Sequence, residues 1–386
     1  MKNKSSIISK VYRRTRLFVF KDLGLEPKFL KFYETYRQGK KFKDALAISS
    51  SGQADKKQIC TTNSVEPLYY PDHTITDTNV YIAQIPNQGA GIGHQIANYN
   101  CGLRLALKYG IGHAYVPFVD KDWDRFLGFG QNELTVKDLK RQGYKVKKMP
   151  SISIMGHDML DAIVAYYKQS GQKVILLTQI DEFYAKQYGV IPYIKRKFEE
   201  AEARKDDDKL LGEHAEVLLH KNSSKGADSV SEQANDNNHK LEDVDFINIA
   251  VHIRRGDINS GQVSGDKQLT MRWLSNEYYE KVLDQVVSKL EDKKINLFIF
   301  SQGDKNDYES YEKYGQVYYC LDMPPMESFI RMVRADILIT SKSSFSYKPA
   351  LLSDGIRICP PGFWHGYPDD EKWIVAGEDG EIRLKT

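Results

Sequence analysis

The sequence predicts an α/β protein made of two Rossmann-like domains that face a cleft, with mostly parallel sheets. Short apolar runs alternate with longer helical patterns along most of the chain, which is typical of strand, helix, strand units. The runs are apolar throughout, as expected for strands that are covered on both faces. A length of 386 residues suits two domains, at about 100 to 200 residues each.

The first domain is predicted over residues 79–220, after a basic arm and linker over residues 1–78. The second part of that region is rich in Ser, Thr, Asn, Asp and Gln, which indicates a linker. A glycine-rich turn, PNQGAGIG, joins the first strand of the domain to its first helix. Strands are expected over 79–85, 113–119 and 173–178, and helices over 94–110, 157–170 and about 181–220.

The second domain is predicted over residues 246–386. The segment 221–245 before it holds almost no apolar residues, so it is predicted to be a disordered linker or insertion. Ligands of two such domains would bind at the carboxyl ends of the strands, in the cleft between the domains. Strands are expected over 246–253, 295–300, 317–320, 336–340 and 356–359, and helices over 273–290, 325–335 and 345–355.

Charge is unevenly distributed along the chain. Residues 1–43 hold 13 Lys and Arg against 3 Asp and Glu, while the rest of the chain holds 42 against 49. Apolar residues recur at helical spacing in this arm, so it is predicted to lie on an anionic membrane surface, or else to be a solvated extension that packs on the body. No RNA-binding or zinc-finger signature accompanies it, so nucleic acid is not an expected partner.

The cysteines and apolar runs bear on the compartment. The four cysteines stand singly along the chain, which indicates neither a structural zinc site nor a disulfide framework. No apolar run approaches the roughly 20 residues of a membrane-spanning helix, and the N-terminus lacks the features of a signal peptide. We therefore expect a cytoplasmic protein, which is peripheral to a membrane if the arm binds one.

The segment VHIRRGDINSG, residues 251–261, carries the first candidate site. It follows a predicted buried strand and places Arg254 and Arg255 side by side, and guanidinium groups bind phosphate or diphosphate through two parallel hydrogen bonds. Gly256 allows a sharp turn, and Asp257 can hold one of the arginines in place. The alternative is a surface ion-pair cluster.

A second candidate site follows the strand expected at 336–340. Ser343, Ser344 and Ser346 offer hydroxyl groups beside the N–H groups of a helix N-terminus, and the two together form an anion site. Ordinary helix capping explains such serines equally well. Their place after a strand of the same predicted sheet as the arginine pair favours phosphate binding.

The glycine-rich turn is the third candidate. Gly91 and Gly93 would let a substrate approach the backbone closely, and His94 and Gln95 would point into the cleft from the start of the helix. The glycine spacing, and the lack of an acid at the end of the next strand, argue against a nicotinamide cofactor. A tight turn without a ligand is the alternative.

A metal site is the remaining possibility raised by the sequence. Asp120 and Asp122 follow a predicted strand, with Asp124 two residues further on, and their carboxylates could hold Mg²⁺ or Mn²⁺ against a diphosphate. Short acidic loops after strands are common, and the chain already offers arginines and a helix end for phosphate charge. The favoured interpretation therefore expects neither a metal nor a cofactor.

Taken together, these motifs resemble those of the α1,2- and α1,6-fucosyltransferases. The resemblance covers roughly residues 79–360, and its three motifs occur in the expected order. The first, His252-Ile-Arg254-Arg255-Gly-Asp257, is similar to the H-x-R-R-x-D motif of that family. The loop that ends in Gly93-His94-Gln95 is similar to its G-x-G-x-Q loop, and its third motif is similar to Ser343-Ser344-Phe345-Ser346.

The resemblance implies the GT-B arrangement of two Rossmann-like domains, GDP-fucose as the donor, no metal, and inversion at the sugar carbon. Arg254 would hold the β-phosphate and stabilise the charge that grows on departing GDP, as a preorganised cationic donor. The resemblance does not identify the general base for the acceptor hydroxyl, and Asp266 is our candidate for it. The rest of the nucleotide-sugar site would comprise His252, Arg255, Asp257, Ser343, Ser344, Phe345, Ser346 and, to read guanine, Glu327 or Asp322.

The sequence thus predicts an inverting, metal-independent glycosyltransferase that transfers fucose from GDP-fucose to a hydroxyl of a glycan or glycolipid acceptor. Three alternatives stay open. The donor could be another nucleotide sugar, the reaction could depend on a metal held by Asp120 and Asp122, or the chain could be a non-catalytic module that binds a glycan or a nucleotide.

Overall fold

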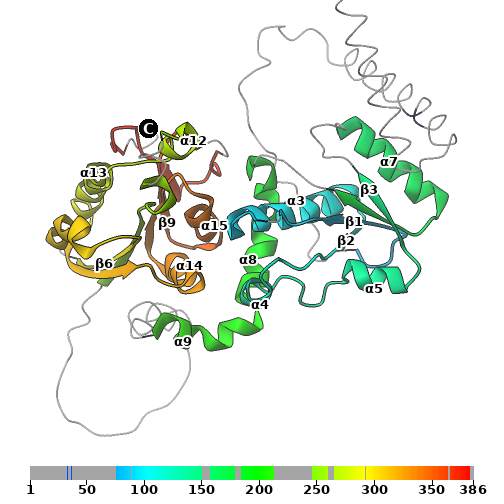
Figure 1. The fold of residues 1–386 in the computed structure, drawn as a ribbon, viewed down its shortest axis with the longest axis horizontal. Coiled ribbons are helices and arrows are strands. Elements are labelled where there is room, and N and C mark those ends of the chain that lie inside the picture. The colour runs from blue at the N-terminus through cyan, green and yellow to red at the C-terminus, as the bar shows by residue number, and fades with distance from the viewer. Residues whose placement is uncertain are drawn as a thin grey trace, which may run out of the picture. The chain divides into compact units, whose positions relative to one another are not determined.

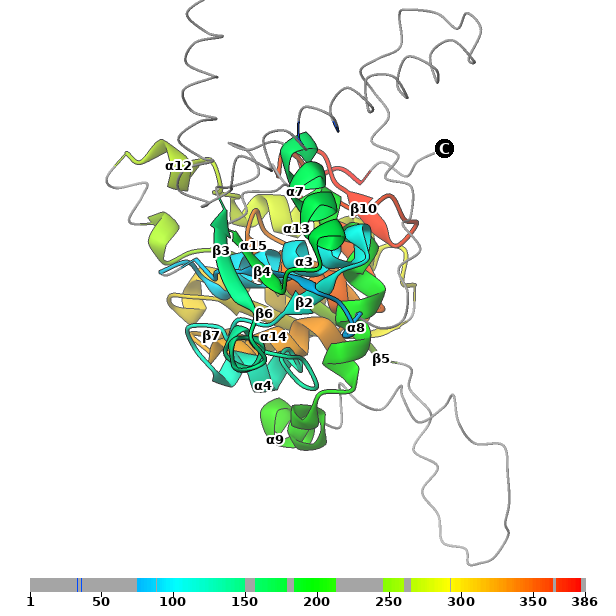
Figure 2. The same ribbon diagram turned by 90° about the vertical axis from the view of Figure 1, so that its right-hand side faces the viewer.

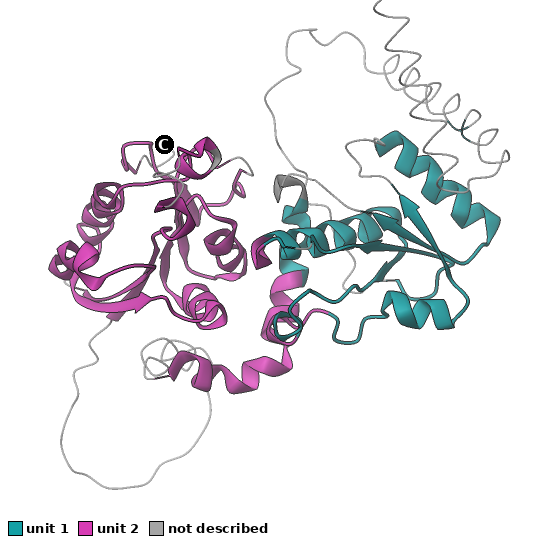
Figure 3. Cartoon of the chain, in the orientation of Figure 1, with its two compact units in different colours: residues 1–90, 94–124, 130–193 teal, residues 91–93, 125–129, 194–386 magenta. Residues whose placement is uncertain are grey.

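A computed structural model describes most of the chain as two compact units, coloured separately in Figure 3. One unit holds the described residues within 1–90, 94–124 and 130–193, and the other holds those within 91–93, 125–129 and 194–386. Each unit contains one all-parallel sheet, so the predicted α/β class is confirmed. The described residues are 33, 36, 75–87, 89–149, 157–178, 184–212, 246–259, 265–291, 293–363 and 366–382.

Several predictions about segments cannot be compared with the structure. Most of the basic arm and linker, and the whole of segment 221–245, lie outside the described residues. The arrangement of the two units about a cleft stays a prediction. Within the described residues, no helix combines the length and the apolarity that crossing a bilayer requires.

The sheet of the first unit has the strand order β2-β1-β4-β3. Apolar side chains alternate between its faces, because Val80 and Ile82 of β1 pack with α3 and α7 while Tyr81 and Ala83 pack on the opposite face with Leu139 of α5. Both faces are thus covered, as predicted. The elements are β1 (Val80–Gln84), α3 (Ile92–Tyr109), β2 (Gly112–Ala114), α5 (Val136–Arg141), β3 (Lys145–Met149), α7 (His157–Ser170) and β4 (Val174–Thr178).

Two of the predictions for this unit were wrong in detail. The strand expected over 113–119 ends at Ala114, and only an isolated bridge from Tyr115 to Thr135 continues it, since Pro117 cannot donate to a ladder. The strand β3 was not predicted at all. Its sequence KVKKM is mostly charged because β3 is an edge strand with exposed and half-buried side chains.

The second unit has a sheet of order β10-β9-β8-β5-β6-β7, and Figure 1 labels β6 and β9 of this sheet with the helices α12, α13, α14 and α15. One face packs against α13 and the tyrosines of η4, and on the other face Phe345 of α15 lies against His252 of β5. The strands are β5 (Phe246–His252), β6 (Lys294–Ser301), β7 (Gln316–Leu321), β8 (Ile337–Ile339), β9 (Ile356–Cys359) and β10 (Trp373–Val375). The helices are α12 (Lys267–Thr270), α13 (Asn276–Val287), η4 (Lys305–Tyr314), α14 (Pro325–Arg334) and α15 (Ser344–Leu352).

This strand order contains a topological switch point. From β5 the chain proceeds through β6 to β7 at one edge of the sheet, and from β8 it proceeds through β9 to β10 at the other edge. The strands β5 and β8 are direct neighbours, with Ile249, Ala250 and Val251 paired to residues of β8. The connections leaving their carboxyl ends therefore part in opposite directions, and ligands of such sheets bind at switch points of this kind.

The single helix expected over about 181–220 is broken, and what is described of it ends at Gly212. The break has a clear cause, because Ala201 is extended, with φ −60° and ψ 137°, and starts a new turn. The described pieces are η1 (Tyr184–Val190), α8 (Ile191–Glu199), η2 (Glu202–Asp206) and α9 (Asp207–Leu211), the last three of which appear in green in the second view (Figure 2).

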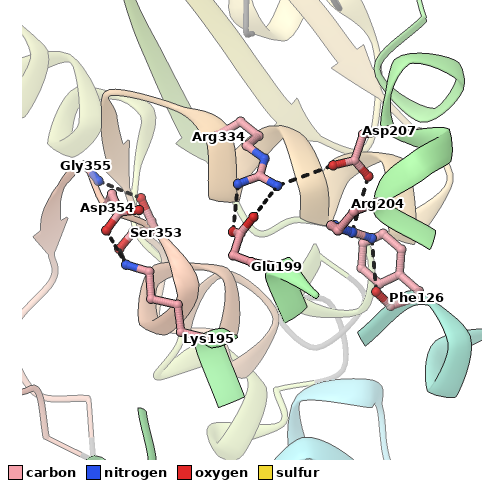
Figure 4. Close-up of polar contacts among 9 residues, drawn as sticks. All are labelled: Phe126, Lys195, Glu199, Arg204, Asp207, Arg334, Ser353, Asp354 and Gly355. Carbon is pink, nitrogen blue, oxygen red and sulfur yellow. Dashed lines mark hydrogen bonds and ion pairs between the residues drawn. The ribbon is translucent and has the colours of Figure 1, made fainter. Parts of the chain in front are cut away.

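The pieces from Ile194 onward belong to the second unit, upstream of the boundary expected at residue 220. Arg334 of α14 holds them with hydrogen bonds of 2.8 and 2.9 Å to the two carboxylate oxygens of Glu199 and one of 3.3 Å to Asp207 (Figure 4). Arg204 pairs with Asp207 at 3.3 Å, and its guanidinium lies 4.0 Å from the ring centre of Phe198. Arg334 thus connects Glu199 and Asp207 to α14, while the buried Arg204–Asp207 pair stabilises the segment itself.

Candidate functional site

The candidate site lies at the switch point between β5 and β8, where a charged side chain and a helix N-terminus come together. Arg254 follows β5 by two residues, and Ser343 follows β8 and caps α15. The guanidinium Nη1 of Arg254 lies 3.5 Å from the hydroxyl of Ser343. Sequence reasoning predicted both residues separately, and the structure brings them together.

Arg254 is held in place by its neighbour Asp257. Nη2 donates to Oδ2 of Asp257 at 2.8 Å, and Nε lies 3.4 Å from Oδ1, which makes a two-pronged pair. The side chain of Arg254 is 19% exposed and that of Asp257 is 56% exposed. The aspartate thus fixes one edge of the guanidinium from the solvent side, while Nη1 points toward Ser343.

The start of α15 is built as an N-terminal cap. The hydroxyl of Ser343 accepts from the backbone N–H of Phe345 at 3.2 Å, and the hydroxyl of Ser346 accepts from the N–H of Ser341 at 3.2 Å. Ser346 is fully buried, so its role is to shape the turn, while Ser344 is only half-buried. The positive end of the helix dipole and the Arg254 guanidinium therefore meet at one place, which suits an anion.

His252 lies under this site as a buried, neutral ring. Burial, with the nearby charges of Arg254 and Arg255, lowers the pKa of His252 to about 3. Its ring centre is 5.7 Å from that of Phe345, and its Nδ1 has no hydrogen-bond partner among the described residues. The His252 ring therefore packs against Phe345 in the first turn of α15.

The guanidinium of Arg255 points away from the Arg254–Ser343 pair. Its guanidinium donates to the carbonyl oxygens of Arg254 and Leu274 at 2.9 and 3.0 Å and to Oδ1 of Asn276 at 2.5 Å. The same group lies 4.0 Å from the ring centre of Trp273, as in a cation–π stack. The structure therefore engages Arg255 in bracing the turn after β5, on the side of the strand away from Ser343.

The glycine-rich turn divides between two roles. Gly93 packs so closely against Ser344 that a Cβ atom would lie 2.7 Å from the Ser344 carbonyl oxygen, so only glycine fits there. Gly91 has open space around it.

The two side chains after the glycines lie in the first turns of α3. Gln95 is buried and connects two loops, since it donates to the carbonyl oxygen of Ala90 at 3.0 Å and accepts from the N–H of Val119 at 3.2 Å. His94 is half-buried in the first turns of α3.

The predicted acidic residues follow other elements of the second unit. Asp266 is exposed, and its backbone carbonyl accepts from Leu269 and Thr270 at the start of α12. Glu327 sits in the first turn of α14, after β7, with Asp322 exposed between β7 and that helix. No side-chain contact of these acids to Arg254 is part of the described structure.

The three aspartates of the metal alternative have different surroundings. Asp124 accepts from the hydroxyl of Tyr115 and from the N–H of Phe118 at 3.1 Å, and its burial raises its pKa. Asp120 accepts from the N–H of Asp122 at 3.0 Å, and both residues are exposed. In the described part of the chain, no three His, Cys, Asp or Glu residues gather in a way that could hold a metal ion.

A pocket beside β6 was not predicted from the sequence. Its lining residues follow β5, precede or begin α13, or follow β6, and it is an open pocket of about 670 Å³. The only signal in the sequence was a tryptophan, Trp273, in a polar stretch before a helix. The lining residues are Arg255, Asn259, Trp273, Ser275, Asn276, Glu277, Gln302, Asp307 and Tyr308.

Comparisons with known proteins give a general likeness. No family model and no curated protein matches the sequence. POFUT1 in complex with GDP-fucose is similar over 73% of this chain and 96% of its own, at 14% identity and a TM-score of 0.43. POFUT1 in complex with GDP gives 74% and 99%, 12% identity and 0.44. A glycosyl transferase of family 9 from Veillonella parvula DSM 2008 gives 79% and 89%, 12% identity and 0.38.

Proposed function

We propose that the protein is a glycosyltransferase that uses a nucleoside-diphosphate sugar as its donor. The observation that carries this proposal is the meeting of Arg254 with the capped N-terminus of α15 at the switch point between β5 and β8. A guanidinium and a helix N-terminus both favour negative charge, and the switch point is where such sheets bind ligands. A diphosphate fits this combination better than a carboxylate or a neutral ligand.

Within that class, the donor is proposed to be GDP-fucose and the acceptor a glycan hydroxyl. This finer assignment is supported by the resemblance of the H-x-R-R-x-D motif, in which Arg254 and Asp257 form a two-pronged pair. The acceptor oxygen would attack the sugar carbon from the face opposite the diphosphate. The bond from that carbon to the β-phosphate oxygen would break, its electron pair leaving with GDP, and a base would take the hydroxyl proton.

Arg254 is the residue proposed to act on the leaving group. Its charge is fixed before the reaction by Asp257, so no reorganisation is needed as negative charge grows on the β-phosphate. A metal ion supplies the same stabilisation in other transferases, and here Arg254 and the helix end are proposed to take that role. Arg255 and His252 are proposed to position Arg254 and the α15 turn from below.

A nucleotide panel tests this function. Thermal unfolding of the full chain would be followed with GDP, UDP, CMP and ADP in the presence of EDTA, since a ligand at about 100 times its dissociation constant stabilises the folded state by about 2.7 kcal/mol. Stabilisation by GDP above the other nucleotides is expected. A preference for UDP, or a response that needs Mn²⁺, would point to another sugar transferase or to a metal held by Asp120 and Asp122.

Turnover separates an enzyme from a binding module. GDP release from GDP-fucose, measured against a series of glycan acceptors, is expected to rise with at least one acceptor. Binding of GDP without any turnover would favour the non-catalytic module, and no response to any nucleotide would contradict the proposed donor class.

A further inference from the structure

The pocket beside β6, hereafter the β6 pocket, lies on the opposite side of β5 from Ser343. Arg254 points toward β8, and the next residue, Arg255, points into the wall of this pocket. The pocket volume of about 670 Å³ falls in the range of about 300 to 1,000 Å³ that small-molecule sites occupy. The end of one strand thus separates the proposed diphosphate site from a second, unassigned cavity.

The residues that line the β6 pocket contact one another through hydrogen bonds and a cation–π stack. The Arg255 guanidinium stacks on Trp273 and bonds to Asn276, and the Nδ2 of Asn276 donates to the carbonyl oxygen of Asp307 at 2.7 Å. Tyr308 donates to the carbonyl oxygen of Gln302 at 2.9 Å. Residues from three separate loops are therefore tied to one another, so the cavity is formed before any ligand arrives.

The chemistry of the lining selects against anions. Among the described lining residues the one cation is Arg255, which donates to two carbonyl oxygens and to Asn276, while Glu277 and Asp307 bring two carboxylates. Asn259 and Gln302 add exposed amide groups, each with a donor and an acceptor. A ligand with many hydroxyl groups, which also donate and accept, matches this lining, and the rings of Trp273 and Tyr308 offer apolar surface to its C–H groups.

We infer that the β6 pocket binds an uncharged saccharide and is the acceptor site of the proposed transferase. The inference rests on the proposed function, because it gives the pocket a partner for the donor held by Arg254. A saccharide in this pocket would present its hydroxyl beside the β5 end, next to the proposed diphosphate site. The negative lining keeps the pocket distinct from the site for GDP.

Binding of simple glycosides tests the inference. Saturation-transfer NMR would be recorded on the full chain with GDP present, using the methyl glycosides of glucose, galactose, mannose and N-acetylglucosamine as probes. At least one is expected to bind. Gln302→Leu, which leaves the stack of Trp273 on Arg255 intact, is expected to weaken that binding at least tenfold, and Trp273→Phe at least threefold.

Gln316→Leu is the matched control, because Gln316 is an exposed amide at the start of the edge strand β7 and does not line the pocket. It should bind the glycoside as the wild type does. The inference is wrong if none of the four probes binds, or if Gln302→Leu binds as tightly as Gln316→Leu. It is also wrong if Gln302→Leu loses the GDP response, since the pocket would then belong to the nucleotide. A wild-type protein that ignores GDP but binds a glycoside would contradict the donor and not the pocket.

Discussion

At the scale of single residues, the two adjacent arginines divide their work. Successive side chains of an extended chain point to opposite sides, so His252 and Arg254 face α15 while Arg255 faces the other way. The sequence analysis placed both guanidinium groups in the nucleotide-sugar site, with Arg254 at the β-phosphate. The alternation of side chains along a strand would have placed Arg254 and Arg255 on opposite faces. The partners of Arg255 could not be predicted in this way, because groups such as the Leu274 carbonyl lie 19 residues further along the chain and have no signature in the sequence.

The buried histidine gives a pH prediction at the same scale. The pKa of His252 is lowered to about 3 from an ordinary value of 6.5. Between these two pH values His252 is protonated in the unfolded chain but stays neutral in the folded protein. The free energy of unfolding should therefore fall as the pH drops from about 6.5 toward 3. The contribution of this one group approaches about 1.4 kcal/mol per pH unit.

Urea unfolding at pH 7, 6, 5 and 4 measures this effect in wild type and in His252→Asn. The variant lacks the titrating ring, so its stability should depend less steeply on pH, while all other groups contribute equally to both proteins. Parallel curves over this range would show that His252 has the same pKa in the folded and unfolded states, which would contradict a ring kept neutral by burial.

At the scale of elements, the N-terminal cap of α15 both starts the helix and contributes to the proposed diphosphate site. The helix begins at Ser344 because Ser343 accepts from the N–H of Phe345, and the same hydroxyl lies 3.5 Å from Arg254. The sequence predicted both the helix and the cap. It could not predict how closely Gly93 packs on Ser344, since that approach joins residues about 250 positions apart in the chain.

Ser343→Ala is expected to lower the free energy of unfolding by about 1 kcal/mol, as the loss of an N-cap does, and to weaken GDP binding as well. Thr135→Ala is the matched control, because Thr135 caps α5 with a complete capping box far from Arg254 in sequence. Both variants should lose similar stability in urea, but only Ser343→Ala should bind GDP more weakly. Equal GDP affinity in the two would remove the α15 cap from the binding site.

At the scale of the whole molecule, the sequence allowed the α/β class and the parallel sheets to be predicted, because buried parallel strands are apolar along their length. The edge strands β3 and β10 were missed, because KVKKM of β3 is mostly charged and WIV of β10, although apolar, is only three residues long. The attachment of residues 194–211 to the second unit was also missed. It depends on the pairing of Arg334 with Glu199 and Asp207, which are more than 120 residues away in sequence.

The strand order of the second sheet was not predicted either, and it supplies the main reason for placing the site where we do. Alternating strands and helices are compatible with many orders, and only the pairing of β5 with β8 creates a switch point beside Arg254. The motif resemblance and this topology point to the same residues by independent routes.

Calorimetric titration of GDP in the presence of EDTA, with wild type, Arg254→Lys and Arg141→Lys, tests the central claim most directly. A lysine keeps the charge but cannot make the two-pronged contacts of the guanidinium, so Arg254→Lys should bind GDP at least about tenfold more weakly, or about 1.4 kcal/mol. Arg141→Lys, at an exposed surface arginine of α5, should bind as the wild type does. Equal affinity in all three proteins would contradict the placement of the diphosphate at the switch point between β5 and β8.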